Sequence, residues 1–203
     1  MEERFYGILT SIDWNSRKWQ DVPTDEDLAH ADYDYVKEHG YTNTAINFGH
    51  ELFTVDKSGY YSGLLPQLWS KVPDLTKARY VQAVFIRSRS WRDQQHYIVG
   101  FYAFPVFRKC IIPSPIKSFT RDFEMNVKAY RKDIHMLEKY IRLGDDNMFR
   151  FLPVGKRMGT QGFNYLTKKN VLNILDEMTN HNPADTRLSG IKLRLIQSIG
   201  AEI

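Results

Sequence analysis

The chain has a single cysteine, Cys110, among its 203 residues. One cysteine cannot form an internal disulfide, and it cannot supply a zinc site built from several thiolates. No window approaches the roughly 18 uninterrupted apolar residues that a membrane-spanning helix needs. The first residues, MEERFYGIL, place acidic side chains before the apolar run, the reverse of a signal peptide. We therefore expect a soluble protein that stays in the cytosol.

Catalytic and nucleotide-binding motifs are missing too. The six histidines show neither an HExxH pattern nor another clustered ligand spacing. The glycine-rich segment VGKRMGTQG contains Lys156 but lacks the four-residue gap that precedes Gly-Lys-Ser/Thr in a phosphate-binding loop. No GxSxG motif accompanies the serines. The sequence therefore predicts a binding module without a catalytic residue, a metal site or a cofactor.

Charge is unevenly distributed along the chain. The formal net charge is only +4. Residues 1–79 hold 8 basic and 13 acidic side chains, whereas residues 80–203 hold 20 and 11, and residues 108–169 alone hold 14 and 6. A polyanion would be attracted to the second half of the chain. The alternative is that these lysines and arginines only solvate the surface.

The stretch that organises the fold is a predicted β-hairpin. Residues 80–88 and 96–104 are dense in Val, Ile, Phe and Tyr, and a polar loop separates them. The second run is almost entirely apolar, which is typical of a strand covered on both faces, so we expect the hairpin in the middle of a sheet. Its loop holds Trp91 between Arg89 and Arg92, side chains that suit contact with a base and with phosphates.

Most of the remaining predicted strands and helices lie in the second half of the chain. We predict strands at 4–12, 106–112, 123–130 and 148–152, and helices at 24–40, 133–143, from 167 and from 183 to about 199. The helix at residue 24 begins with a capping box, Thr24 with Asp27, and Lys57-Ser58-Gly59 forms a turn in an otherwise uncertain connection at 41–73. This order predicts an α+β domain on a curved, barrel-like mixed β-sheet with flanking helices and C-terminal helices.

Several short segments together resemble a known family. YIVGFYAFPVF follows VFIRS, INFGH precedes them, and the basic FRFLPVGKR comes after. This arrangement is similar to the EVE/YTH branch of PUA-like domains, and more narrowly to the N-terminal recognition domains of archaeal McrB-type proteins from modification-dependent restriction systems. The resemblance covers about residues 4–180. It implies a recognition domain at 1–180 and a C-terminal helix at 181–203 leading towards a GTPase region outside this chain, through which the parent protein oligomerises.

The resemblance also implies the ligand and its site. Such domains take a flipped, methylated base into an aromatic cage, and in McrB-type proteins the target is DNA. An aromatic face rewards the added methyl by dispersion, and stacking of one base is worth about 1–3 kcal/mol. By position, the base-binding candidates are Asp13, Trp14, Asn15, Asn47, Phe48, Trp91 and Tyr130. The phosphate-binding candidates are Arg89, Arg92, Arg131, Lys132, Lys156 and Arg157.

Each candidate has a structural alternative. YTH domains place a tryptophan where INFGH offers Phe48, which can equally be a core residue. Trp14 and Trp19 can pack at the edge of the core instead of holding a base. At the level of function, the alternatives are an RNA-binding module of the same fold and a protein-interaction domain that docks through Tyr60 and Tyr61.

Overall fold

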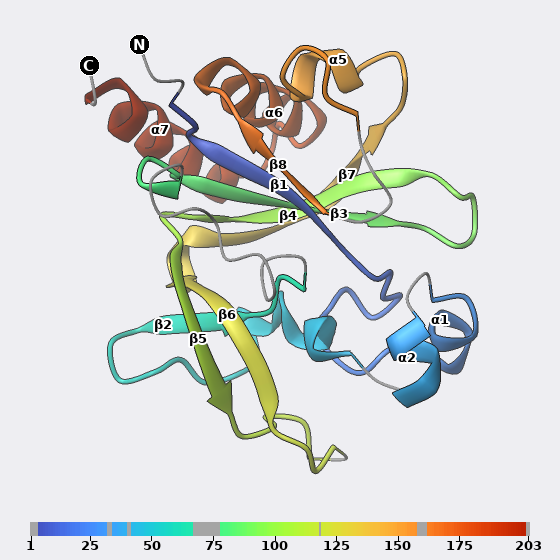
Figure 1. The fold of residues 1–203 in the computed structure, drawn as a ribbon. Helices are drawn as coiled ribbons and strands as arrows, with labels where there is room; N and C mark the ends of the chain where they lie inside the picture. Colours follow the sequence, from blue (N-terminus) through green and yellow to red (C-terminus); the bar gives the residue numbers. More distant parts are fainter. Residues whose placement is uncertain are drawn as a thin grey trace.

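A computed structural model describes residues 4–31, 34–39, 42–66, 78–117, 119–157 and 162–201. The described strands form two sheets, of five strands in the order β7-β4-β3-β1-β8 and of three in the order β2-β6-β5. Two C-terminal helices cover one face of the larger sheet, and the smaller sheet lies on its other side (Figure 1). The chain is a mixed α+β protein, as predicted, but in the described part the strands make two sheets and no closed barrel.

The predicted hairpin lies at the centre of the larger sheet. Its strands are buried along most of their length because β1 and β7 flank them and both faces are covered. β1 pairs with β3 in parallel and with β8 in antiparallel orientation. The five strands are β1 (Gly7–Ile12), β3 (Ala83–Arg89), β4 (His96–Ala103), β7 (Ile134–Leu143) and β8 (Phe163–Leu166).

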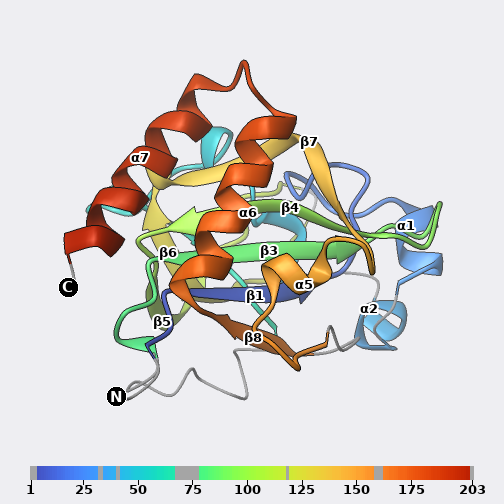
Figure 2. The same ribbon diagram turned by 90° about the horizontal axis from the view of Figure 1, so that it is seen from above.

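The helical face carries the first core. α6 (Lys168–His181) begins at Thr167, whose side chain forms a reciprocal capping box with Asn170. α7 (Thr186–Ala201) runs beside it (Figure 2). Both helices were expected from the sequence, and they bury an apolar stripe on the sheet. The stripe consists of Val171, Ile174, Leu175, Met178, Leu188, Ile191, Leu195 and Ile199.

A second core fills the space between the two sheets. The smaller sheet consists of β2 (Tyr60–Gly63), β5 (Val106–Ile112) and β6 (Phe123–Tyr130), and the last two match predicted strands. From the larger sheet, Ile8, Val84 and Tyr102 contribute to this core, and Val127 comes from β6. The single 3-10 turn η3 (Arg131–Asp133) joins β6 directly to β7, so the chain passes from one sheet into the other there.

The segment after β1 is less regular than predicted. Thr24 caps a helix with Asp27 as expected, but α1 (Asp25–Ala29) is short, and a second short helix, α2 (Asp34–His39), follows. The predicted stop at residue 40 lies outside the described residues. Two 3-10 turns, η1 (Asn43–Ile46) and η2 (Gly49–Glu51), lead to the turn at 57–59 that precedes β2. No helix in the described ranges is long and apolar enough to cross a membrane.

The helix predicted at 133–143 is wrong, because this segment is strand β7. Ile134, Leu137 and Ile141 have helical spacing, yet all three are buried in a strand. An irregular pairing explains this. Gly100 pairs with Met136, and Ile98 pairs with Ile141. Two positions along β4 therefore correspond to five positions along β7. The extra residues interrupt the two-residue alternation, so the apolar pattern imitates a helix.

The strand predicted at 148–152 is also wrong. Met148–Phe151 forms one helical turn, α5, which follows a turn closed by Asn147. The side chain of Asn147 accepts a bond from the Gly144 N–H and donates one to the Arg142 carbonyl oxygen. These bonds between the side chain and the nearby backbone favour a turn over an extended strand. Strand β8 was not predicted, because its four residues give too short a pattern.

Candidate nucleic-acid interface

Both predicted base-binding tryptophans lie just beyond the ends of neighbouring strands of the larger sheet. β1 and β3 are parallel, with Ile12 opposite Ser88. Trp14 follows the end of β1, and Trp91 follows the end of β3, so both lie beyond the carboxyl ends of neighbouring strands. We call this region, residues 13–31 and 90–97, the hairpin end.

Asp27 joins the two halves of the hairpin end. Its Oδ1 accepts hydrogen bonds from the indole Nε1–H of Trp91 at 2.9 Å and from the hydroxyl of Ser16 at 2.7 Å. Its Oδ2 accepts from the backbone N–H groups of Ser16 at 2.9 Å and Thr24 at 3.1 Å. Asp27 is almost fully buried, and the four hydrogen bonds replace those that its carboxylate would make with water. A residue expected only to cap a helix thus positions a candidate base-binding ring.

The ionisation of Asp27 follows from this geometry. Burial alone raises the pKa of the carboxyl group, but the hydrogen bonds from Trp91, Ser16 and Thr24 outweigh it. The pKa therefore lies below its ordinary value, and the carboxylate is charged at neutral pH. A charged acceptor holds the Trp91 indole more firmly than a neutral one would.

Trp14 belongs to a cluster of four aromatic rings and is itself only half-buried. Its ring lies 5.8 Å from that of Trp19, 6.2 Å from Tyr97 and 6.1 Å from Tyr140, measured between centroids. Trp19 is fully buried, whereas Trp14 is half-buried. Among the described residues, the Trp14 Nε1–H has no hydrogen-bond acceptor although the atom itself is buried. The exposed part of the ring is suited to a ligand that stacks on it.

Trp91 lies beside a small polar cavity. The ring of His30 stacks on it at 4.9 Å with an interplanar angle of 16°, and the guanidinium of Arg92 lies 5.2 Å from the ring centroid. The cavity has a volume of about 330 Å³, and Lys37 and Arg89 contribute to its wall. Two predicted phosphate-binding residues, Arg89 and Arg92, are therefore next to a predicted base-binding residue.

Other base-binding candidates are engaged inside the fold. The amide of Asn15 donates to the Asp21 carbonyl and accepts from the Arg17 N–H, and the amide of Asn47 bonds to both backbone groups of Leu64. Phe48 is fully buried against Trp19. The side chains of these three residues are therefore used within the fold, and a base would reach Phe48 only if its neighbours moved.

Asp13 occupies a similar position. Its side chain is buried, and its backbone carbonyl accepts the Nε1–H of Trp19 at 2.8 Å. The contact fixes the turn that carries Trp14. Sequence position alone could not separate such supporting residues from ones that touch a ligand.

Tyr130 lies away from the hairpin end, in the smaller sheet. Its exposed ring stacks on Tyr60 with centroids 4.1 Å apart, and Lys132 lies 5.9 Å from the Tyr130 ring. Arg131 donates to the Phe53 carbonyl at 2.7 Å. Tyr61, the other half of the expected docking pair, is buried and donates to the Ile46 carbonyl. Tyr130, Arg131 and Lys132 thus form a separate group around a shallow hollow of about 610 Å³.

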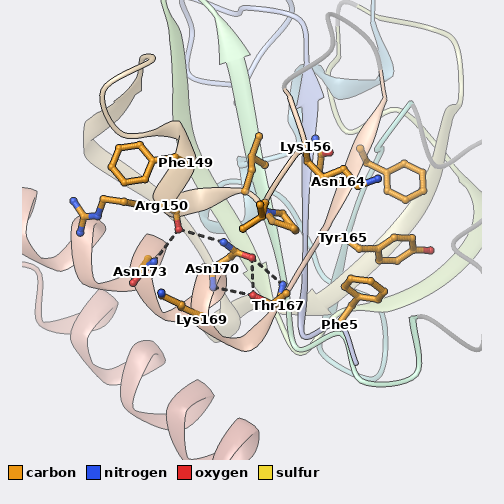
Figure 3. A pocket seen from close by; sticks show the side chains of 14 residues that line it. Phe5, Phe149, Arg150, Lys156, Asn164, Tyr165, Thr167, Lys169, Asn170 and Asn173 are labelled. Carbon is orange, nitrogen blue, oxygen red and sulfur yellow. Dashed lines mark hydrogen bonds between the residues drawn. The ribbon is translucent and has the colours of Figure 1, made fainter. Parts of the chain in front are cut away.

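Lys156 and Arg157 form a third group, after α5. Both are exposed, and Lys156 lines a cleft of about 700 Å³ between α5, β8 and the start of α6. Figure 3 shows this cleft, with Phe149 and Arg150 at one end and the rings of Phe5 and Tyr165 at the other. The sequence interpretation missed these rings because they come from segments far apart in the chain. No local pattern in the sequence connects Phe5 and Tyr165 with Phe149.

The described residues contain no group of three or more His, Cys, Asp or Glu side chains that could hold a metal ion. Comparisons with known proteins give no significant match, whether with protein-family models, with curated proteins or with solved structures.

Proposed function

We propose that this chain is a DNA-binding recognition domain that reads a modified base at the hairpin end. The observation that carries the proposal is that Trp14 and Trp91 follow the ends of two neighbouring parallel strands, and that Asp27 bonds Trp91 to Ser16 in the turn after Trp14. Arg89 and Arg92 lie beside Trp91 and serve as phosphate contacts in this proposal. Aromatic faces next to cationic side chains suit a nucleobase still attached to its phosphates.

The chemistry favours a base taken out of the helix stack. A half-buried indole presents its face only to a ring that has left its neighbours, as in enzymes and readers that flip a base. A methyl group on the base adds apolar area against the ring, worth about 0.8 kcal/mol when fully buried.

The finer part of the proposal rests on the sequence resemblance. It assigns the chain to the PUA-like EVE/YTH type, and to a McrBC-type modification-dependent restriction system in which a separate region of the parent protein carries the GTPase. The chain itself acts by binding and has no catalytic residue in this proposal. In this proposal the larger sheet corresponds to the curved sheet of such domains, and its hairpin end is the base site.

A binding titration of methylated against unmodified DNA duplexes, at two salt concentrations, tests the proposal. We expect tighter binding of the methylated duplex and a loss of affinity at the higher salt. RNA of the same sequence serves as competitor and separates the RNA-binding alternative. Absence of duplex binding even at low salt would overturn the proposal.

Substitutions locate the site. Trp14→Ala and Trp91→Ala should each weaken binding roughly 5- to 150-fold, which corresponds to loss of one base-stacking contact. Tyr130→Ala is the matched control, because it removes an exposed aromatic ring from the other sheet. Thermal unfolding of each variant shows whether the fold survives. Equal losses of binding in all three variants would contradict the placement at the hairpin end.

A further inference from the structure

The cleft between α5, β8 and the start of α6 is lined by charges of one sign only. Three basic side chains line it, Arg150, Lys156 and Lys169, and no carboxylate does. Its volume of about 700 Å³ falls in the range of pockets that enclose a ligand larger than a single ring. We call it the aromatic cleft, because four aromatic rings also line it.

The positive charge of the aromatic cleft is largely uncompensated. Arg150 forms an ion pair with Glu177 at 3.2 Å. Lys156 and Lys169 have no ion-pair partner in the part of the chain that the structure describes, and both are exposed. Two exposed cations on the walls of one cleft, without an ion-pair partner among the described residues, favour an anionic occupant.

The walls of the cleft are held in place by hydrogen bonds. The side-chain amides of Asn170 and Asn173 donate to the backbone carbonyl of Arg150 at 3.2 and 2.8 Å (Figure 3). These bonds fasten the single turn of α5 to the first turns of α6. The cleft therefore exists before any ligand arrives, which lowers the entropic cost of binding.

One of the aromatic rings in the cleft is largely exposed. Phe149 is 73% exposed, so its ring makes little contribution to a core. At the other end, Tyr165 and Phe5 are half-buried and pack with centroids 5.1 Å apart. Phe149 lines the same cleft as Lys156 and Lys169, so its ring is placed for a flat ligand that carries negative charge.

We propose that the aromatic cleft binds a segment of single-stranded DNA. Lys156 and Lys169 contact its phosphates, and unstacked bases lie on Phe149 and Tyr165. A duplex offers phosphates but keeps its base faces covered, so only a single strand uses both the charges and the rings. The site lies along the outer edge of the larger sheet, at β8, and is distinct from the hairpin end at the carboxyl ends of β1 and β3.

Fluorescence anisotropy with a labelled oligothymidylate tests the proposal. Lys156→Glu/Lys169→Glu should weaken binding of this strand at least tenfold. Its control is Lys57→Glu/Lys117→Glu, which changes the net charge equally at two exposed lysines outside the cleft. Phe149→Ala should weaken binding roughly 5- to 150-fold, the effect of losing one stacked base. Because Phe149 is exposed, its replacement should leave thermal stability unchanged.

The outcomes separate this site from the hairpin end. Loss of oligothymidylate binding in the cleft variants, with preference for methylated duplex retained, supports two sites. No binding of the single strand by the unmodified protein, or equal losses in the control pair, overturns the aromatic cleft as a DNA site. A failure of methylated duplex to bind bears on the hairpin end alone.

Discussion

Protonation of His50 should make the protein lose stability in mild acid. His50 lies in η2 and is buried, with its Nε2 3.5 Å from Glu51 Oε1. Burial, followed by the positive charge of Arg187, lowers its pKa from 6.5 to about 4. Glu51 opposes the shift, while His135 and Arg131 add to it. The folded protein therefore holds His50 neutral over a range in which an unfolded chain would bind a proton.

The size of the effect follows from the two pKa values. Because the folded pKa is the lower one, the unfolded state binds more protons between pH 6.5 and pH 4, and stability falls as the pH decreases through that window. Integration between pH 7.0 and 4.5 gives a loss of about 2 kcal/mol from His50 alone. Urea unfolding, followed by tryptophan fluorescence at the two pH values, measures it.

His50→Gln isolates this contribution, because the amide has no proton to gain. The buried or hydrogen-bonded carboxylates, Asp27 among them, destabilise both proteins in acid and cancel in the comparison. The variant should therefore lose about 2 kcal/mol less than the unmodified protein between pH 7.0 and 4.5. Parallel losses in the two proteins would refute the reasoning.

Two further substitutions probe contacts beneath the candidate sites. Asp27→Asn places an amide N–H₂ group where four donors converge. It should lower the free energy of unfolding by about 1.5–3 kcal/mol, measured by urea unfolding. An unchanged stability would show that the carboxylate contributes nothing to the fold through these bonds. Gly100→Ala brings a methyl group within 2.6 Å of the Phe48 ring and against the carbonyl of His135. It should cost about 1–3 kcal/mol, measured in the same way, and a neutral result would mean that the irregular pairing of β4 with β7 adapts freely.

The sequence could predict elements whose pattern is local and regular. The central hairpin has two long apolar runs, and α6 has a capping box and apolar residues spaced at 3.6 residues. The local sequence of each element is therefore enough to predict its secondary structure. β7 does not, because its apolar spacing depends on extra residues relative to β4. A pairing irregularity is a property of two strands together, and no single window of sequence contains it.

The candidate site was predictable only in part, for a related reason. That Trp14 and Trp91 lie at the same sheet edge follows from the parallel pairing of β1 with β3, which the sequence did not specify. The amides of Asn15 and Asn47 have the right chemistry for a base edge, but backbone groups already occupy them. Residue type indicates what a side chain can bind, and only the fold shows what it already binds.

The position of β1 has a consequence for how the protein is made. This strand emerges from the ribosome before both of its neighbours. These are β3, in which Ser88 pairs with Ile12, and β8, which ends at Leu166. Until both have been synthesised, β1 has an unsatisfied edge that can pair with another chain. We expect the nascent protein to depend on rapid translation or on a chaperone at this stage, and folding to be slow because its decisive contacts are so distant in sequence.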